Sequence, residues 1–256
     1  MMNYTMFLYE VLLFILTATL ILGVPFYEFF RKRMVSSERQ IFSRRRVVKV
    51  TIINLGLNIA VYLIFLAMLI ILLLKIQEIN YQIILVSITF LIVTGLAFYG
   101  NGIYITSIVI EAFTLPELKK LNSFKIQFVA THLFHGPISH ILIYSSYIIA
   151  LFLLGLLDIL TGKGSLIFIP YLMICGIVTG IMHALGQILN GTIPYQFLTS
   201  VILFILFLFF IYFKGSSLFG FSVASYFFSF SVAFLLSGLL YFFLKGRREI
   251  IRSLLG

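Results

Sequence analysis

The side chains best suited to chemistry in this chain are four histidines on two neighbouring apolar segments. His132, His135 and His140 come near the start of one segment and His183 near the end of the next, so antiparallel helices would bring them to one side. Imidazoles bind zinc or a haem iron when a coordination position stays open. Together with Glu111, which ends the preceding apolar segment, they form a candidate metal or haem site.

Acidic partners for such a site are scarce. The single aspartate, Asp158, is predicted on the opposite side of the membrane, and Glu111 is the only nearby carboxylate. A catalytic zinc needs a general base and carboxylates that orient its ligands. The histidines could instead bond to carbonyls and hydroxyls near the lipid headgroups. No His-Glu-x-x-His or phosphate-loop motif is present. We therefore expect no catalytic residue and no cofactor, with zinc or haem and a possible hydrolase as the alternative.

One polar stripe follows the segment that contains His183. Gly176, Gly180, His183 and Gln187 recur at helical spacing and share a face. The Gly-x-x-x-Gly spacing allows a second helix to approach closely. We expect this face to pack against protein rather than lipid.

Composition indicates which elements position these residues. Hydrophobic residues make up 62% of the chain and charged residues 10%, so lipid must be the solvent for most of it. The apolar runs are continuous rather than alternating, which favours helices over a barrel. We predict an all-α polytopic membrane protein with about seven spans of ~20 residues each. These spans are Met6–Phe30, Thr51–Lys75, Gln82–Phe113, Gln127–Leu157, Ser165–Leu189, Phe197–Phe213 and Phe221–Leu244.

The basic residues predict orientation. Of 18 Lys and Arg residues, eight lie in 31–49, three in 119–125 and four in 245–252. The positive-inside rule places these segments in the cytoplasm, with the N-terminus outside and the C-terminus inside a cell membrane. The same rule accounts for the net charge of +10 without nucleic acid. We divide the chain into an N-terminal anchor (1–30), a basic amphipathic segment (31–50) and a six-helix membrane domain (51–256).

Two of the apolar stretches are longer than one crossing needs. The third and fourth are expected to continue as helix, to tilt, or to break at Gly100-Asn101-Gly102 and at Gly136-Pro137. Between them, Thr114–Lys125 interleaves apolar and charged residues. This segment is typical of a surface-lying helix, which either binds a partner or rests on the membrane.

The order of these features resembles the ABC-2 class of ABC-transporter permeases. A basic lead-in (31–49) precedes a span, a later span ends in Glu111, and Pro137-Ile138-Ser139 leads into the next after a cytoplasmic stretch. The resemblance implies an elbow helix, and a coupling helix that docks on a separate cytoplasmic ATPase. In this interpretation Pro116, Glu117, Lys119, Lys120 and Pro137 belong to the partner-coupling loop. The predicted function is a non-catalytic permease subunit, with a homo- or heterodimer as its expected assembly.

A second resemblance is to small membrane metal-dependent hydrolases. It rests on the segments His135-Gly136-Pro137-Ile138-Ser139-His140 and His183-Ala184-Leu185-Gly186-Gln187. Gln187 stands where that family has Asp, and its Pro-Asp-x-Asp-His element is absent, so metal ligands would be missing. A purely structural subunit of a larger complex is the third alternative.

Overall fold

The chain folds into long apolar helices joined by short connections. The computed structural model describes residues 8, 11–19, 44–76, 78–118, 125–162, 170–215 and 220–255; the side chains of 44–54, 111–118, 128, 135 and 247–255 lie outside that description. Residues 11–19 are helical. The other elements are α2 (Arg44–Leu74), α3 (Tyr81–Leu118), α4 (Lys125–Leu133), η2 (Phe134–Ile138), α5 (Ser139–Thr161), α6 (Pro170–Leu189), α7 (Ile193–Lys214) and α8 (Ser222–Leu255).

Six described segments are long and apolar enough to cross a bilayer. They are Leu55–Leu74, Tyr81–Ile110, Lys125–Thr161, Pro170–Leu189, Ile193–Lys214 and Ser222–Gly246. The described ranges contain no strand. The prediction of an all-α multi-pass membrane protein is therefore confirmed. The first predicted span, Met6–Phe30, lies mostly outside the described residues.

Local sequence signals set the ends of several helices. The Asn80 side chain accepts a hydrogen bond from the backbone N–H of Ile83 (3.0 Å), which caps the start of α3. The connections after α6 and α7 pass through Gly191 and Gly215, whose φ angles are +71° and +60°. This left-handed conformation is costly for residues with a Cβ atom, so glycine suits both turns.

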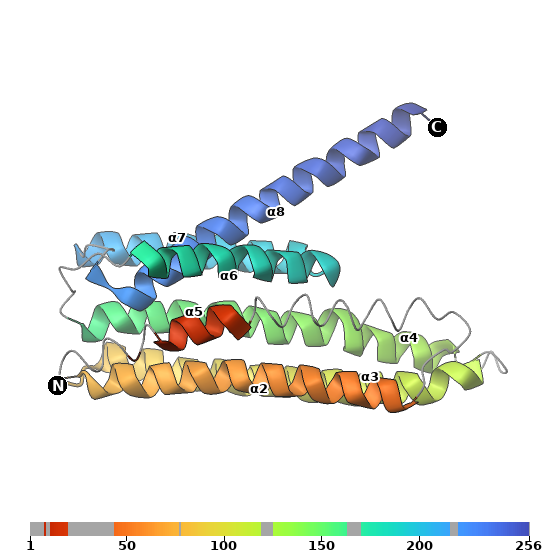
Figure 1. Ribbon diagram of the computed structural model, residues 1–256, viewed down its shortest axis with the longest axis horizontal. Coiled ribbons are helices and arrows are strands. Elements are labelled where there is room, and N and C mark those ends of the chain that lie inside the picture. The colour runs from red at the N-terminus through yellow and green to blue at the C-terminus, as the bar shows by residue number, and fades with distance from the viewer. Residues whose placement is uncertain are drawn as a thin grey trace.

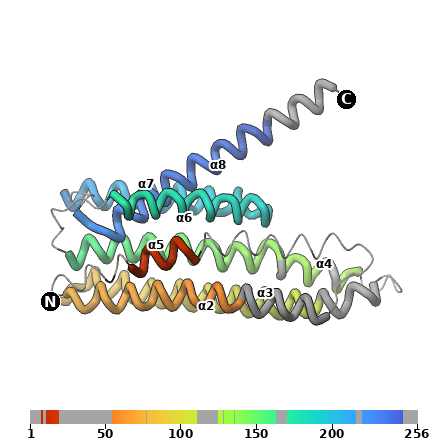
Figure 2. The backbone as a smooth tube through the Cα atoms, viewed as in Figure 1, coloured from red at the N-terminus to blue at the C-terminus, as the bar shows by residue number. Residues whose placement is uncertain are grey.

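The helices run up and down along one direction, and both α2 and α3 extend further than α6 at one end (Figure 1). We call this the basic end, because Arg44, Lys125 and Lys245 lie toward it along their helices; Lys75 and Lys214 lie at the opposite end. The helix α8 packs against α6 and then leaves the bundle at an angle (Figure 2). α5 contacts α2, α3, α7 and α8, so it forms the centre of the bundle.

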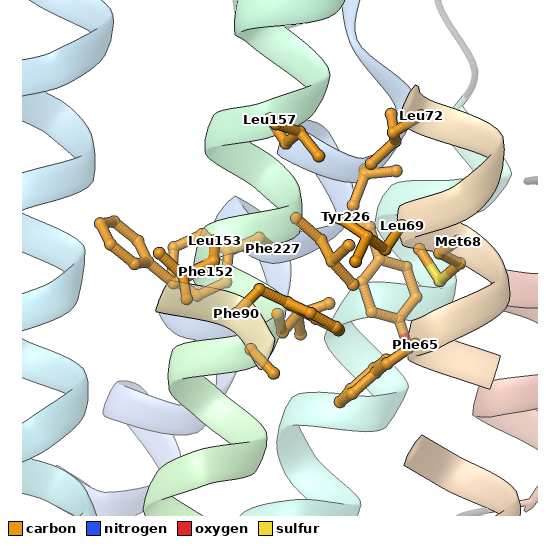
Figure 3. Packing of buried hydrophobic residues seen from close by; sticks show 14 of the residues in the cluster. Phe65, Met68, Leu69, Leu72, Phe90, Phe152, Leu153, Leu157, Tyr226 and Phe227 are labelled. Carbon is orange, nitrogen blue, oxygen red and sulfur yellow. The ribbon is translucent and has the colours of Figure 1, made fainter. Parts of the chain in front are cut away.

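The core lies around α5 toward the opposite end. Phe65, Met68 and Leu72 of α2 and Leu157 of α5 belong to it, whereas Phe152 of α5 points away from α2, toward Phe227 (Figure 3). Tyr226 and Phe227 of α8 complete this cluster from the other side. In lipid such contacts stabilise helix association mainly through close packing, because hydrocarbon surrounds the helices before and after assembly.

A buried group of hydroxyls joins the N-terminal helical residues to this core. Thr179 of α6 lies 2.6 Å from the Tyr226 hydroxyl, and Thr17 lies 3.2 Å from it. The Thr179 hydroxyl also donates to Thr17 (3.2 Å). The three side chains satisfy one another away from water, which fixes residues 11–19 against α6 and α8.

The two long apolar stretches differ in how they accommodate their extra length. The third continues unbroken through Gly100-Asn101-Gly102 as α3, in which a Cβ atom on Gly100 would lie 2.8 Å from Leu142 of α5. Close packing, rather than a helix break, thus explains this glycine. The fourth stretch deforms at Gly136-Pro137, where η2 forms. Residues 114–118, expected in a surface-lying helix, are instead the last residues of α3.

Candidate functional site

A π-helical turn joins α4 to α5 without interrupting the helix. Pro137 has no N–H group, and its ring would clash with the carbonyl one turn earlier in a regular α-helix. The turn widens here: the Ser139 N–H donates to the carbonyls of Phe134 and Gly136. Such π-helical turns are local points of deformation and often occur at functional sites. A displacement of α4 would therefore pass into α5 through one identifiable bend.

Three cross-helix contacts mark one level near the basic end. Asn190, in the turn between α6 and α7, donates to the Tyr144 hydroxyl of α5 (3.2 Å). Gly100 of α3 lies against Ile143, next to Tyr144 in sequence. Asn58 of α2 donates to Asn101 of α3 (2.8 Å). The turn between α6 and α7 therefore lies at the same height along the bundle as these residues of α2, α3 and α5.

Beyond this level α2, α3 and the α4–η2–α5 rod continue as helix. We call residues 44–57, 102–118 and 125–143 the projection; they extend roughly 20–28 Å along their axes at 1.5 Å per residue. With 20 and 22 residues, α6 and α7 measure about 30 and 33 Å, which matches the ~30 Å hydrocarbon thickness. The projection is thus additional length, in excess of one crossing.

The helix α4 presents an apolar stripe on its exposed side. Ile126, Val129 and Leu133 recur at helical spacing and are 82%, 58% and 52% exposed. The opposite side faces the chain, since Thr131 is buried and bonds to the Gln127 carbonyl (2.7 Å). α4 contacts α3 and η2 on that side.

The predicted coupling residues lie around α4. Pro116 and Glu117 are in the last turn of α3, and Pro137 is in the π-helical turn. Lys119 and Lys120 lie outside the described residues. The side chains of Pro116 and Glu117 are outside the description as well, so the structure gives only their backbone position.

The histidines are spread over different environments. His132 is exposed on α4, whereas His140 is buried beside Tyr104 and Tyr144 at ring-centroid distances of 5.6 and 5.5 Å. The side chains of His135 and Glu111 lie outside the description. Among the described side chains, no three His, Cys, Asp or Glu residues lie close enough to hold a metal ion.

His183 occupies an aromatic environment. Its ring stacks on Tyr147 with a centroid distance of 4.8 Å and an interplanar angle of 15°, and it contacts Phe230 and Phe234 at 5.7 and 5.4 Å. Its Nε2 atom has no hydrogen-bond partner among the described residues. The surroundings suit a neutral packing residue.

The glycine stripe on α6 lies directly against α8. A Cβ atom on Gly176 would lie 2.5 Å from the Tyr226 carbonyl oxygen, and one on Gly180 would collide with that of Phe230. At the end of the stripe, Gln187 is buried and accepts a hydrogen bond from the Thr192 hydroxyl (2.5 Å). The α6–α8 contact is therefore a close approach of two backbones.

The helix α7 has a polar inward stripe that motif searches do not reveal. It buries only Ile193, Gln196, Ser200 and Phe207, which share one face. The Ser145 hydroxyl of α5 donates to the Gln196 amide oxygen (3.3 Å). The Gln196 Nε2 and Ser200 hydroxyl have no hydrogen-bond partner within the described part of the chain. The recognisable signal was a glutamine and a serine four residues apart in an otherwise apolar segment.

Asp158 has a role that sequence reasoning also missed. It is 3% exposed, and its Oδ2 atom accepts hydrogen bonds from the backbone N–H groups of Val223 (2.8 Å) and Ala224 (3.4 Å). These groups belong to the first turn of α8, whose partial positive charge favours a carboxylate. Asp158 of α5 thus caps α8. A lone acidic residue in an apolar segment was a visible signal.

Lys75, which follows α2, interacts electrostatically with the same carboxylate. Burial lowers the pKa of Lys75 below its usual value, and the negative charge of Asp158 opposes this decrease. Lys75 and Asp158, one basic and one acidic, both lie near the end of the bundle that faces away from the basic end. They contribute to the electrostatics of that end and lie far along the helices from the histidines.

Comparisons with known proteins give no relative. No protein-family model, no curated protein and no solved structure matches the chain.

Proposed function

We propose that this protein is a non-catalytic subunit of a membrane transporter in the cell membrane, coupled to a separate cytoplasmic ATPase. The observation that carries the proposal is the projection at the basic end, which is continuous through the π-helical turn with α5. A membrane protein that only packs in lipid has no need for helices that exceed the bilayer at one end. A subunit moved by a soluble partner does need such a contact.

The exposed stripe of α4 supports a protein partner. Ile126, Val129 and Leu133 lie beyond the level at which α6 and α7 end, which favours contact with a partner over contact with hydrocarbon. Exposed apolar stripes on helices are typical of surfaces that dock into a groove of a protein partner. The basic residues of the projection, which include Arg44 and Lys125, favour an acidic rim on that partner.

The ATPase is the partner that the resemblance to ABC-2 permeases implies. The positive-inside rule places the basic end in the cytoplasm, where such an ATPase would be. The alternative, a metal or haem protein, is not favoured by any arrangement of the described side chains. Elemental analysis and a search for a Soret band in the purified protein test that alternative directly.

The deciding experiment is purification from native membranes in mild detergent, with mass spectrometry of co-purifying proteins. We expect a stoichiometric nucleotide-binding ATPase with the wild type. Lys119→Glu/Lys120→Glu and Ile126→Ser/Val129→Ser should each release it.

Ile79→Ser is the matched control, because Ile79 is 74% exposed but lies at the opposite end. It should retain the partner. Thermal unfolding of every variant shows whether the helices remain folded. Recovery of the wild type without any ATPase, or equal retention by the α4 variants, would overturn the proposal.

A further inference from the structure

The inward face of α7 is unusual for a helix that is held in a bundle. Two of the four residues that α7 buries are polar, Gln196 and Ser200. They are 0% and 1% exposed, and each has a polar atom without a partner in the described part of the chain. In hydrocarbon an unpaired polar group is costly, and buried groups of this kind call for an explanation.

A third unpaired group lies on α8, about one helical turn from Ser200 along the bundle. Ser231 of α8 is 1% exposed, and its hydroxyl also has no partner among the described residues. The contact between Phe207 and Phe227 (4.8 Å between ring centroids) fixes the alignment of α7 with α8. Ser200 lies seven residues before Phe207, and Ser231 lies four residues after Phe227. Both serines are therefore closer to the basic end than this ring pair, on the faces where α7 and α8 contact each other.

α5 provides the third wall. Ser145 donates to Gln196, and Phe152 contacts both Phe207 (6.2 Å) and Phe227 (5.7 Å). Ser145, Gln196, Ser200 and Ser231 therefore lie between α5, α7 and α8 within about two helical turns. We call them the serine–glutamine cluster.

The chemistry of the cluster is uncharged. α7 contains no charged residue before Lys214, and Asp158 is thirteen residues from Ser145, about 20 Å along α5. The available groups are hydroxyls, which donate and accept, and one amide N–H₂ donor. They match a ligand that offers hydroxyl groups, which both donate and accept, and that has no net charge.

We propose that the serine–glutamine cluster binds an uncharged, hydroxyl-bearing ligand between α5, α7 and α8. The cluster is close to the basic end, since Gln196 is three residues from the start of α7. A ligand could reach it as a lipid with a neutral headgroup or as a soluble polyol. That this ligand is the transported substrate rests on the proposed function; the binding site itself does not.

The test uses the purified protein in phosphatidylcholine nanodiscs without its ATPase, so failure of the coupling proposal leaves the result interpretable. Cys175 is the only cysteine, and a thiol-reactive dye at this partly buried residue reports unfolding. The probes are monooleoylglycerol, oleate, oleylamine and methyl oleate, which share one acyl chain, together with free glycerol. Only monooleoylglycerol or glycerol should raise the unfolding midpoint, and the pair distinguishes a lipid source from a soluble one.

Ser200→Ala and Ser231→Ala are the informative variants. Each removes an unpaired hydroxyl, so the ligand-free midpoint should rise by roughly 2–4 °C or more. Each should also bind the neutral probe about tenfold more weakly through loss of one hydrogen bond. Ser237→Ala is the matched control on α8, because the Ser237 hydroxyl already donates to the Ala233 carbonyl (2.8 Å).

Two results would overturn the proposal. A lower ligand-free midpoint in both serine variants, with no response of the wild type to neutral probes, would mean that ordered water fills the cluster. An equal response to oleate, oleylamine and methyl oleate would mean that acyl chains bind without recognition of hydroxyl groups.

Discussion

Asp158 offers the sharpest test of how this bundle holds together. It lies in α5, yet its carboxylate accepts hydrogen bonds from the first turn of α8, at 2.8 Å from the Val223 nitrogen and 3.4 Å from the Ala224 nitrogen. In Asp158→Ala these N–H groups would remain in an apolar environment. Loss of a helix cap costs about 0.5–2 kcal/mol, and a hydrogen bond to a charged group contributes about 1.5–3 kcal/mol.

Since the second bond is long, we count one strong bond and expect Asp158→Ala to lower the free energy of unfolding by about 1.5–3 kcal/mol. Asp158→Asn keeps an acceptor oxygen and loses only the interaction of the charge with the helix dipole. That term is about 0.3–2 kcal/mol. The expected order of stability is therefore wild type, then Asn, then Ala.

Thermal unfolding followed by a thiol-reactive dye at Cys175 measures this order in the purified protein. Tryptophan fluorescence is not an option, because the chain contains no Trp. If Asp158→Asn and Asp158→Ala were equally stable, the hydrogen bonds to α8 would contribute nothing and the reasoning would be refuted. Equal stability of all three proteins would refute it as well.

Three further predictions concern other parts of the bundle. Because burial lowers the pKa of Lys75 in the folded state, the unfolded state binds more protons between that pKa and the usual value near ~10.5. Stability should thus rise with pH over this window, and Lys75→Met should flatten the rise; an unchanged slope in chemical denaturation would contradict this. Gly180→Ala should lower the free energy of unfolding by about 1–3 kcal/mol, since its Cβ atom would collide with the Phe230 carbonyl of α8. Gly102→Ala, with nothing within 4 Å of its Cβ atom, should instead gain about 0.5–1 kcal/mol, and equal effects in the dye assay would count against the close approach. His183→Phe keeps a stacked ring and removes an unpaired nitrogen, so it should unfold no earlier than the wild type; a large loss of stability, or loss of a bound metal, would restore the metal hypothesis.

The helices themselves could be predicted from the sequence because lipid leaves few options. A continuous apolar run of ~20 residues must satisfy its backbone internally, and only a helix does so within one segment. The glycine spacing of α6 carried similar information: a Cβ atom on Gly176 or Gly180 would collide with α8. Such predictions succeed because each depends only on the residues of one segment and on how closely a neighbouring helix can approach that segment.

The remaining features depend on contacts between segments, which periodicity does not specify. The sequence of α5 predicts that Asp158 lies on the side opposite the histidines, but nothing in that segment reveals that α8 begins beside it. Gly100 suggested a helix break, because a glycine that relaxes a helix and one that admits Leu142 look identical in sequence. The predicted third span ends at Phe113, whereas α3 continues to Leu118, because a helix can extend beyond the apolar run that marks a membrane span.

Hydrogen-bond satisfaction distinguishes Asp158, which stabilises the bundle, from the two serines that we propose contact a ligand; an unpaired atom is not enough by itself, because among the described residues the packed His183 also has one. Asp158 is buried with its acceptor occupied, so its removal should destabilise the empty protein. Ser200 and Ser231 are buried with no partner in the described ranges, so their removal should stabilise it. Function is one reason why a destabilising group persists in a natural protein, and it gives rise to trade-offs between stability and activity. Opposite signs for aspartate and serine substitutions in one assay would therefore locate the functional interface at α7, even before any ligand is identified.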